Sequence, residues 1–176
     1  MLAPALTTAV LFRNGKHSYA TFAQKAEYLL GDGKQKPWYD SAARALECTK
    51  KMLGVKVYAM IKLYGDDLFK DYISNAYDLG QSFSELIEAQ PDFELAVKPD
   101  GNIVCFRFCP ENYSGDIDSL NSAIRKRSLE DARYYIVQTQ VRGKVYLRVS
   151  LMNPFTTISE LNALITDIRE NYSKSK

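Results

Sequence analysis

Residues 134–151, with the sequence YYIVQTQVRGKVYLRVSL, contain two runs of alternating apolar and polar side chains joined by Arg142-Gly143. Alternation is typical of half-buried strands, and a short link with a glycine is typical of a tight hairpin turn. A second hairpin is predicted upstream, where residues 93–97 and 103–108 flank the turn 99–102. The sequence therefore predicts an antiparallel sheet built from two hairpins.

Helices are predicted between these hairpins and after them. Asp116 or Asp118 can cap a short helix between the two hairpins. After Asn153-Pro154 closes the last strand, Thr157 and Glu160 have the spacing of a capping box, in which each side chain bonds the other's free backbone N–H. The second half is thus expected to be ββαββα, an α+β fold whose antiparallel sheet carries helices on one face.

The first half of the chain predicts mostly helix. Its expected elements are one strand and three helices, over residues 6–13, 18–30, 41–64 and 67–90. Gly65 is expected to end the third of these elements, and Pro91 follows the fourth. The glycine-rich segment 31–37 predicts a mobile loop. This half does not close on itself, so it is expected to be the tail of something larger.

The composition narrows the class of protein. With 176 residues, 46% of them hydrophobic, the chain has material for about one packed domain. A net charge of +2 is too balanced for a dedicated nucleic-acid binder. One histidine, His17, and three cysteines leave few ways to build a metal site, so no metal is expected. No apolar run approaches the roughly 20 residues of a membrane span, and the cysteine usage predicts a reducing, cytoplasmic compartment.

Arg148 is a candidate binding residue. Alternate residues of the last predicted strand face opposite sides, so Arg148 shares a face with Tyr146 and Ser150. If the helices cover the other face, Arg148 points away from them. A guanidinium there can hold a carboxylate or phosphate through two parallel hydrogen bonds, whereas the commoner role of a strand arginine is a solvated surface charge. Arg107 has a similar setting with a weaker case.

Tyr28 precedes the predicted loop 31–37. A tyrosine beside a mobile loop can donate a proton to a reacting atom, although packing is the commoner role of tyrosine. The basic run 125–127 is followed by Glu130 and Asp131, which favours a solvated helix end over a phosphate site.

Five segments form a joint pattern along the chain: residues 4–12 (PALTTAVLF), 26–30 (AEYLL), 91–95 (PDFEL), 102–107 (NIVCFR) and 146–154 (YLRVSLMNP). Together they resemble the C-terminal part of the pyridoxal-phosphate-dependent amino-acid decarboxylases, the group that holds glutamate, aromatic-amino-acid, histidine and diaminobutyrate decarboxylases. The resemblance implies the small domain of a fold type I enzyme over residues 66–176. Residues 1–65 would be the end of the large cofactor-binding domain, with a mobile catalytic loop and a connecting helix.

The resemblance also implies roles for four residues. Tyr28 matches a loop tyrosine that reaches the neighbouring subunit and protonates the substrate carbon after carbon dioxide leaves. Arg148, followed by the same Asn-Pro step, matches an arginine that binds the substrate α-carboxylate in glutamate decarboxylases. Cys48 and Thr49 fall where backbone groups contact the phosphate of pyridoxal 5′-phosphate across the dimer interface, although a glycine is usual in place of Thr49.

In that family the Schiff-base lysine precedes the segment that resembles residues 4–12. The expected function is therefore a C-terminal fragment of a homodimeric decarboxylase for a small L-amino acid, glutamate-like by preference and inactive alone. The alternative is a stand-alone dimerisation or interaction module that performs no catalysis. Under either interpretation, the helices over 41–90 are expected to expose apolar surface.

Overall fold

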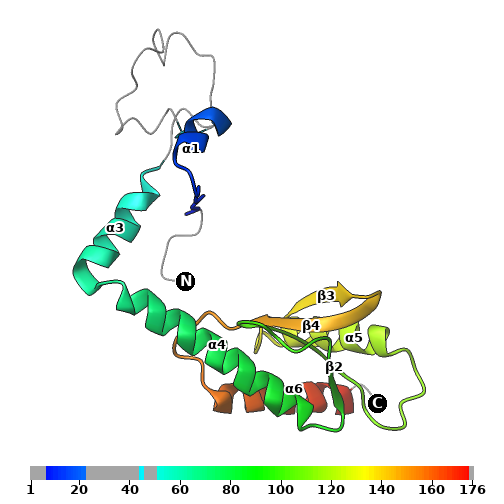
Figure 1. Ribbon diagram of the computed structural model, residues 1–176. Coiled ribbons are helices and arrows are strands. Elements are labelled where there is room, and N and C mark those ends of the chain that lie inside the picture. Colours follow the sequence, from blue (N-terminus) through cyan, green and yellow to red (C-terminus); the bar gives the residue numbers. More distant parts are fainter. Residues whose placement is uncertain (1–6, 23–43, 46–50, 175–176) are drawn as a thin grey trace. The chain divides into compact units, whose positions relative to one another are not determined.

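The computed structural model describes residues 7–22, 44–45 and 51–174 of the chain (Figure 1). The chain divides into two compact units, Leu2–Gly65 and Asp66–Lys176. In chain order the described elements are α1 (Lys16–Thr21), α3 (Leu53–Tyr64), α4 (Asp67–Glu88), β1 (Phe93–Leu95), β2 (Ile103–Phe108), α5 (Ile117–Glu130), β3 (Val137–Val141), β4 (Lys144–Ser150) and α6 (Ile158–Ser173). None of these helices has the length and apolar character needed to cross a membrane.

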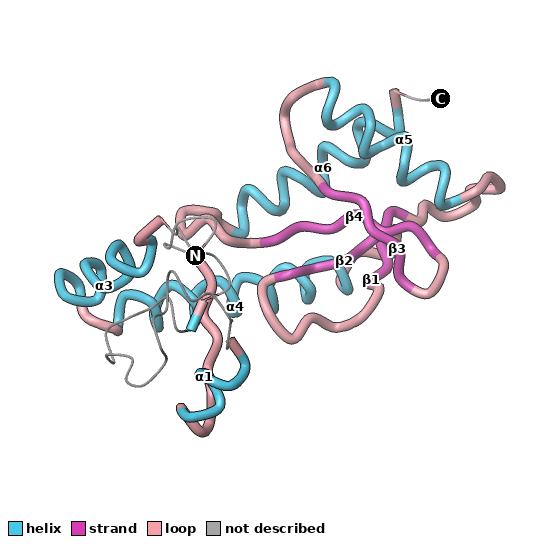
Figure 2. The backbone as a smooth tube through the Cα atoms, turned by 90° about the horizontal axis from the view of Figure 1, so that it is seen from above, coloured by secondary structure: helices cyan, strands magenta, loops and turns pink. Residues whose placement is uncertain are grey.

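The four strands form one antiparallel sheet in the order β1-β2-β4-β3 (Figure 2). Both predicted hairpins are confirmed, and the pairing of β2 with β4 joins them. In the β3–β4 turn, Arg142 and Gly143 have φ values of 51° and 77°. Two consecutive residues with positive φ match the right-handed twist of the flanking strands. The predicted ββαββα arrangement, an α+β fold, is therefore confirmed.

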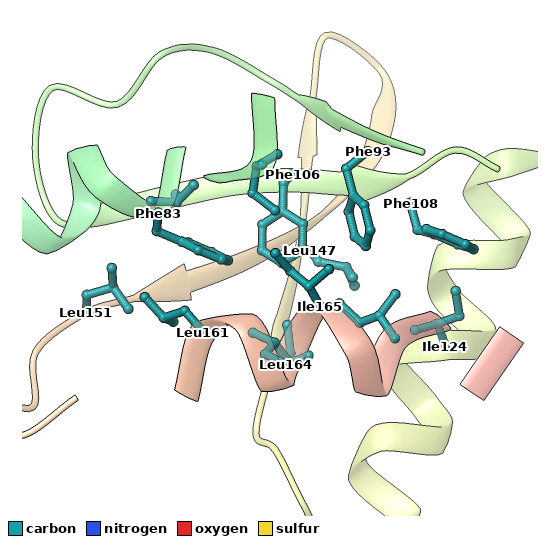
Figure 3. Close-up of a cluster of buried hydrophobic side chains, with 14 of the residues drawn as sticks. Phe83, Phe93, Phe106, Phe108, Ile124, Leu147, Leu151, Leu161, Leu164 and Ile165 are labelled. Atoms are coloured by element: carbon teal, nitrogen blue, oxygen red, sulfur yellow. The ribbon is translucent and has the colours of Figure 1, made fainter. Parts of the chain in front are cut away.

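One face of the sheet is covered by α4, α5 and α6. Phe106 and Leu147 point from the sheet toward Leu164 and Ile165 of α6 (Figure 3), and all four side chains are buried. The core also takes Phe83 from α4, whose ring meets that of Phe106 edge-on at 5.3 Å between centroids. Burial of these large apolar side chains supplies the main driving force for folding of this unit.

α5 fills a gap between two strands of the sheet. The residue pairing of β2 with β4 stops at Phe106 and Leu147. Beyond it, the buried Asn121 side chain of α5 accepts a hydrogen bond from Phe108 N (2.8 Å) and donates one to Phe108 O (2.9 Å). Asp118 Oδ1 accepts one from Val145 N at 3.0 Å. Two helix side chains thus satisfy strand groups that have lost their strand partner.

α4 passes very close to the turn between β1 and β2. A Cβ atom on Gly80 would collide with the carbonyl oxygen of Gly101. Glycine is therefore required at position 80 for close packing, which offsets its poor helix propensity.

The predicted helix caps are also present. Asp116 accepts hydrogen bonds from the backbone N–H groups of Asp118 and Ser119 and so begins α5. The capping box is confirmed, because Thr157 N donates to Glu160 Oε2 at 2.7 Å. Each cap satisfies helix N–H groups that have no partner within the helix.

The first half differs from the prediction in three places. The helix predicted over 18–30 is α1, which begins at Lys16 and ends at Thr21 with Phe22 as its C-cap, and residues 23–30 lie outside the described residues. Residues 7–12 are not a strand, and none of the described residues pairs with them, so the β-prone composition is not enough. The helix predicted over 41–64 is not continuous, because Lys51 and Met52 are non-helical and α3 begins at Leu53. The helically spaced apolar residues on which that prediction rests have no member between Leu46 and Leu53. The predicted end at Gly65, where φ is 76°, is confirmed.

Arg169 connects α6 to the segment between α4 and β1. Its guanidinium donates to both carboxylate oxygens of Asp92, at 2.7 and 2.6 Å, and to Gln90 Oε1 at 2.8 Å. It also lies 5.3 Å from the centroid of the Phe93 ring. The hydrogen bonds from Arg169 lower the pKa of Asp92 below its ordinary value.

Replacing Arg169 with methionine is expected to lower the free energy of unfolding by about 1 kcal/mol at pH 7, a value reduced for the partial exposure of the pair. The pKa of Asp92 is lowered in the folded state, so this contribution is full above the unfolded pKa of about 4 and is lost as the pH falls through the folded value. Urea unfolding of both proteins at pH 7 and pH 3 measures the effect.

Lys126→Met is the matched control, because Lys126 and Glu130 form an exposed pair at 3.8 Å. That substitution is expected to change stability by less than about 0.5 kcal/mol. An Arg169 effect that persists undiminished at pH 3 would contradict the role of the Asp92 carboxylate.

Candidate functional site

The sheet has a second face, opposite the core, which carries most of the polar strand residues. Strand pairing and pleating place the following residues on this open face: Glu94, Ile103, Cys105, Arg107, Val137, Thr139, Val141, Lys144, Tyr146, Arg148 and Ser150. The core residues alternate with them along the same strands. We refer to these eleven residues as the open face.

Arg148 lies near the middle of the open face, as the alternation predicts. Its direct cross-strand neighbours are Cys105 on β2 and Val137 on β3. Arg148 is half-buried, and its Nε atom is buried and makes no hydrogen bond within the part of the chain that the structure describes. Because an unpaired buried donor costs about 1–3 kcal/mol, such an atom indicates a place where a ligand can supply the acceptor.

Arg107 is the second arginine of the open face, and its charge is already paired. Its Nε and Nη2 atoms both donate to Glu94 Oε2, with the Nε contact at 3.1 Å. The Tyr146 hydroxyl donates to Glu94 Oε1 at 3.1 Å, and the guanidinium of Arg107 lies 5.1 Å from the Tyr146 ring centroid. Asp118 is 3.8 Å from Arg107 Nη1. This paired cluster spans β1, β2 and β4.

The contacts in this cluster shift the ionisation of its members. Burial acts to raise the pKa of Glu94, but the hydrogen bonds from Arg107 and Tyr146 outweigh it and lower that pKa. Burial and the hydrogen bond to Glu94 raise the pKa of Tyr146. Glu94 is therefore an anion at neutral pH, and Tyr146 is a neutral donor.

Cys105 reports on the charge of Arg148. Burial raises the pKa of the Cys105 thiol, and the positive charge of Arg148 acts in the opposite direction. Burial also raises the pKa of the Cys109 thiol, and there Arg107 supplies the opposing charge. The positive charge that opposes the raised thiol pKa thus comes from Arg148 for Cys105 and from Arg107 for Cys109.

A cavity of about 300 Å³ lies near Ser150, between the ends of the central strands and α4. Its lining residues are Tyr72, Ile73, Ala76, Tyr77, Asn102, Ile103, Ser150 and Met152. Arg148 is not among them, so this mainly apolar cavity is separate from the arginine site.

Three of the four predicted site residues cannot be placed. Tyr28, Cys48 and Thr49 lie outside the described residues, and so does the predicted loop 31–37. Their roles stay predictions. Sequence reasoning missed the partner of Arg107, although one signal was present: Glu94 alternates with apolar neighbours and follows the same strand pattern.

A comparison with protein families identifies the type of chain. The profile of the pyridoxal-dependent decarboxylase conserved domain matches residues 1–109. The chain belongs to this family. The resemblance to the pyridoxal-phosphate-dependent amino-acid decarboxylases is therefore confirmed, and pyridoxal 5′-phosphate is the cofactor of the intact enzymes.

Curated relatives and solved structures agree with this assignment. Aspartate 1-decarboxylase of Aliivibrio fischeri is 24% identical over 173 residues, which cover 86% of this chain and 31% of the relative. L-2,4-diaminobutyrate decarboxylase of Acinetobacter baumannii is 25% identical over 127 residues, which cover 72% of this chain and 25% of the relative. The chain thus spans about a third or less of the curated relatives it matches.

Among solved structures, the glutamate decarboxylase domain of a diaminobutyrate-pyruvate transaminase and L-2,4-diaminobutyrate decarboxylase from Vibrio parahaemolyticus is 26% identical. It superposes with a TM-score of 0.66 over 72% of this chain and 27% of that one. Tryptophan decarboxylase of Catharanthus roseus, at 20% identity, shares the fold with a TM-score of 0.69, over 77% of this chain and 29% of that one.

The open face carries N–H donors that can bind anionic groups of the kind found on pyridoxal phosphate and on amino acids. The cofactor carries a phosphate and an amino-acid substrate carries a carboxylate, and both need N–H donors. Arg148 offers a buried donor without a partner among the described residues, whereas Arg107 is committed to Glu94. Of the two open-face arginines, Arg148 is therefore the one suited to an external anion.

Replacing Arg148 with glutamine is expected to slow alkylation of Cys105 by iodoacetamide at pH 8, on the order of two- to threefold. Loss of the nearby positive charge raises the thiol pKa further and leaves less thiolate. Trypsin cleaves after Arg107 and separates Cys105 from Cys109, so mass spectrometry follows each thiol by itself.

Cys109 is the internal control, and its rate is expected to stay constant. Arg148→Lys keeps the charge and is expected to leave both rates close to wild type. Equal rates for Cys105 in the wild-type chain and Arg148→Gln would show that the two side chains do not interact.

Proposed function

We propose that this chain is the C-terminal part of a pyridoxal-phosphate-dependent amino-acid α-decarboxylase, with a small, glutamate-like L-amino acid as the favoured substrate. The observation that carries the proposal is the buried Nε of Arg148, which has no hydrogen-bond partner among the described residues. The family match supplies the reaction class. In this proposal Arg148 binds the α-carboxylate, the group that all α-amino acids share.

The bound cofactor supplies the chemistry of bond cleavage, because it withdraws electrons from the bond that breaks. Arg148 donates two parallel hydrogen bonds to the carboxylate and fixes the direction of the bond to the departing carbon dioxide. This ion pair forms before the bond breaks, so it contributes mainly to substrate binding.

The remaining roles belong to residues outside the described part of the chain. Tyr28 donates a proton to the α-carbon after carbon dioxide leaves. The loop over residues 29–39 closes and excludes water while the carbon is unprotected. Backbone groups of Cys48 and Thr49 contact the cofactor phosphate across a homodimer interface. The Schiff-base lysine lies outside these 176 residues, so the chain alone is inactive. A reducing, cytoplasmic compartment completes the proposal and rests on cysteine usage.

Arg148 is expected to respond to a carboxylate ligand. In the ¹⁵N-labelled chain, the Nε–Hε resonance of Arg148 shifts on titration with L-leucine but not with 3-methylbutylamine, which differs by the carboxylate alone. Loss of the peak in Arg148→Gln assigns it, and calorimetric titration of that variant is expected to show about 10- to 100-fold weaker binding of L-leucine, the worth of a hydrogen bond to a charged group.

Arg142→Gln, in the exposed β3–β4 turn, is the control and is expected to bind L-leucine as the wild type does. An Arg148 resonance that ignores both ligands, or follows both equally, would contradict a carboxylate site.

A second candidate function is a stand-alone dimerisation module without catalysis. It is kept because α3 buries none of its residues and so offers apolar surface to a partner, as both functions require. The expected apolar exposure of this segment is confirmed, since Tyr58 is 60% exposed and Leu63 is 74% exposed. Ile73 and Tyr77 of α4 are also exposed. Both functions predict self-association, but they differ in how ordered it is.

On the purified chain, one measurement tests what the two functions share and a second separates them. With pyridoxal phosphate added, both predict that carboxyl-labelled glutamate releases carbon dioxide no faster than with the cofactor alone. In sedimentation velocity, an enzyme part is expected to give a broad distribution that shifts toward the monomer on dilution, because its apolar surfaces have lost their partners. A stand-alone module is expected to give a single dimer boundary, and that outcome would count against the enzyme-part proposal.

A further inference from the structure

The two arginines of the open face differ in whether they already hold a carboxylate. Arg107 has 10% of its side chain exposed and is bonded to Glu94, with Asp118 3.8 Å away. Arg148 has a buried Nε without a hydrogen-bond partner among the described residues. Glu94 is the one acidic residue in the four strands described. Its position therefore decides which strand arginine is neutralised.

Glu94 already reaches the strand that carries Arg148. The Tyr146 hydroxyl on β4 donates to Glu94 Oε1 at 3.1 Å. Arg148 follows Tyr146 by two residues on the same face, about 7 Å further along the strand. The Glu94 side chain is 44% exposed and so has room to turn. Without the guanidinium of Arg107, the cations that this carboxylate can reach along β4 are Lys144 and Arg148, each two residues from Tyr146 on the same face.

We propose that Arg107, together with Tyr146, is a positioning residue that holds Glu94 away from Arg148 and so keeps Arg148 available for a substrate carboxylate. The inference rests on the proposed function of Arg148. Arg107 is suited to this role because it is fixed on two sides: it donates twice to Glu94 Oε2, and its guanidinium lies 5.1 Å from the centroid of the Tyr146 ring, which is itself buried.

A released Glu94 would compete effectively with a free ligand. A tethered group acts at an effective concentration in the millimolar range or above, which is comparable to the free amino acid used in a titration. An ion pair at a half-exposed site is worth up to about a factor of five in an equilibrium constant. Removing Arg107 is therefore expected to weaken carboxylate binding at Arg148 by about fivefold.

The first arm of the test needs no ligand. In the full 176-residue chain, Arg107→Gln is expected to shift the Nε–Hε resonance of Arg148 and slow its exchange with water, because Glu94 now pairs with Arg148. The added substitution Glu94→Gln is expected to return the resonance to its wild-type position. Arg107→Lys keeps the cation beside Glu94 and is expected to leave the resonance unchanged.

The second arm measures the affinity for L-leucine by the same resonance. Arg107→Gln is expected to bind about fivefold more weakly than wild type, and Arg107→Gln with Glu94→Gln is expected to regain wild-type affinity. A purely structural role for Arg107 predicts the opposite, since removing a second member of the cluster would leave the double variant at least as impaired as the single one.

The outcomes separate the two ideas. An Arg148 resonance that does not move in Arg107→Gln, or an affinity that Glu94→Gln does not rescue, overturns the positioning role. A wild-type chain in which L-leucine leaves Arg148 unaffected overturns the carboxylate site, while the ligand-free arm still decides the positioning role. If Arg107→Gln does not fold, Glu94→Gln alone is measured, and binding weaker than wild type overturns the positioning role.

Discussion

The pairing of β2 with β4 is the contact on which the rest of this unit depends. It joins two local hairpins into one sheet, and its register sets Phe106 opposite Leu147 and Cys105 opposite Arg148. Because side chains alternate along a strand, the same register places the first pair in the core and the second on the open face. A slip of one residue would turn the core outward and bury an arginine, so the hydrophobic pattern holds the polar face in place as well.

Two arginines in nearly identical positions therefore differ in whether a protein carboxylate binds them. Arg107 and Arg148 lie on adjacent strands, on the same face, each between apolar neighbours in sequence. The difference lies in a third strand, because β1 pairs with β2 and brings Glu94 beside Arg107. A ligand carboxylate needs a cation that a protein carboxylate does not already bind, and of these two arginines Arg148 is the one without such a partner among the described residues.

Local signals account for what the sequence predicts correctly. The hairpins, the Asp116 cap and the capping box each depend on residues a few positions apart, and the structure has all of them. The helix predicted over 41–64 is not continuous, because its helically spaced apolar residues are interrupted between Leu46 and Leu53. For the site, alternation predicts the face on which Arg148 lies. The contact between Glu94 and Tyr146 joins β1 to β4. It could not be predicted, because the local sequence pattern does not determine the order of strands in a sheet.

The way α5 completes the sheet has a consequence for how this unit folds. Each hairpin closes a short loop, whereas pairing β2 with β4 must close the long one that contains α5. On the side of β2 that faces β4, the N–H and C=O of Phe108 bond to Asn121 rather than to a strand, so these two groups are satisfied when the helix docks. Long-range closure costs chain entropy before it gains contacts, so we expect the pairing of β2 with β4 to form more slowly than either hairpin.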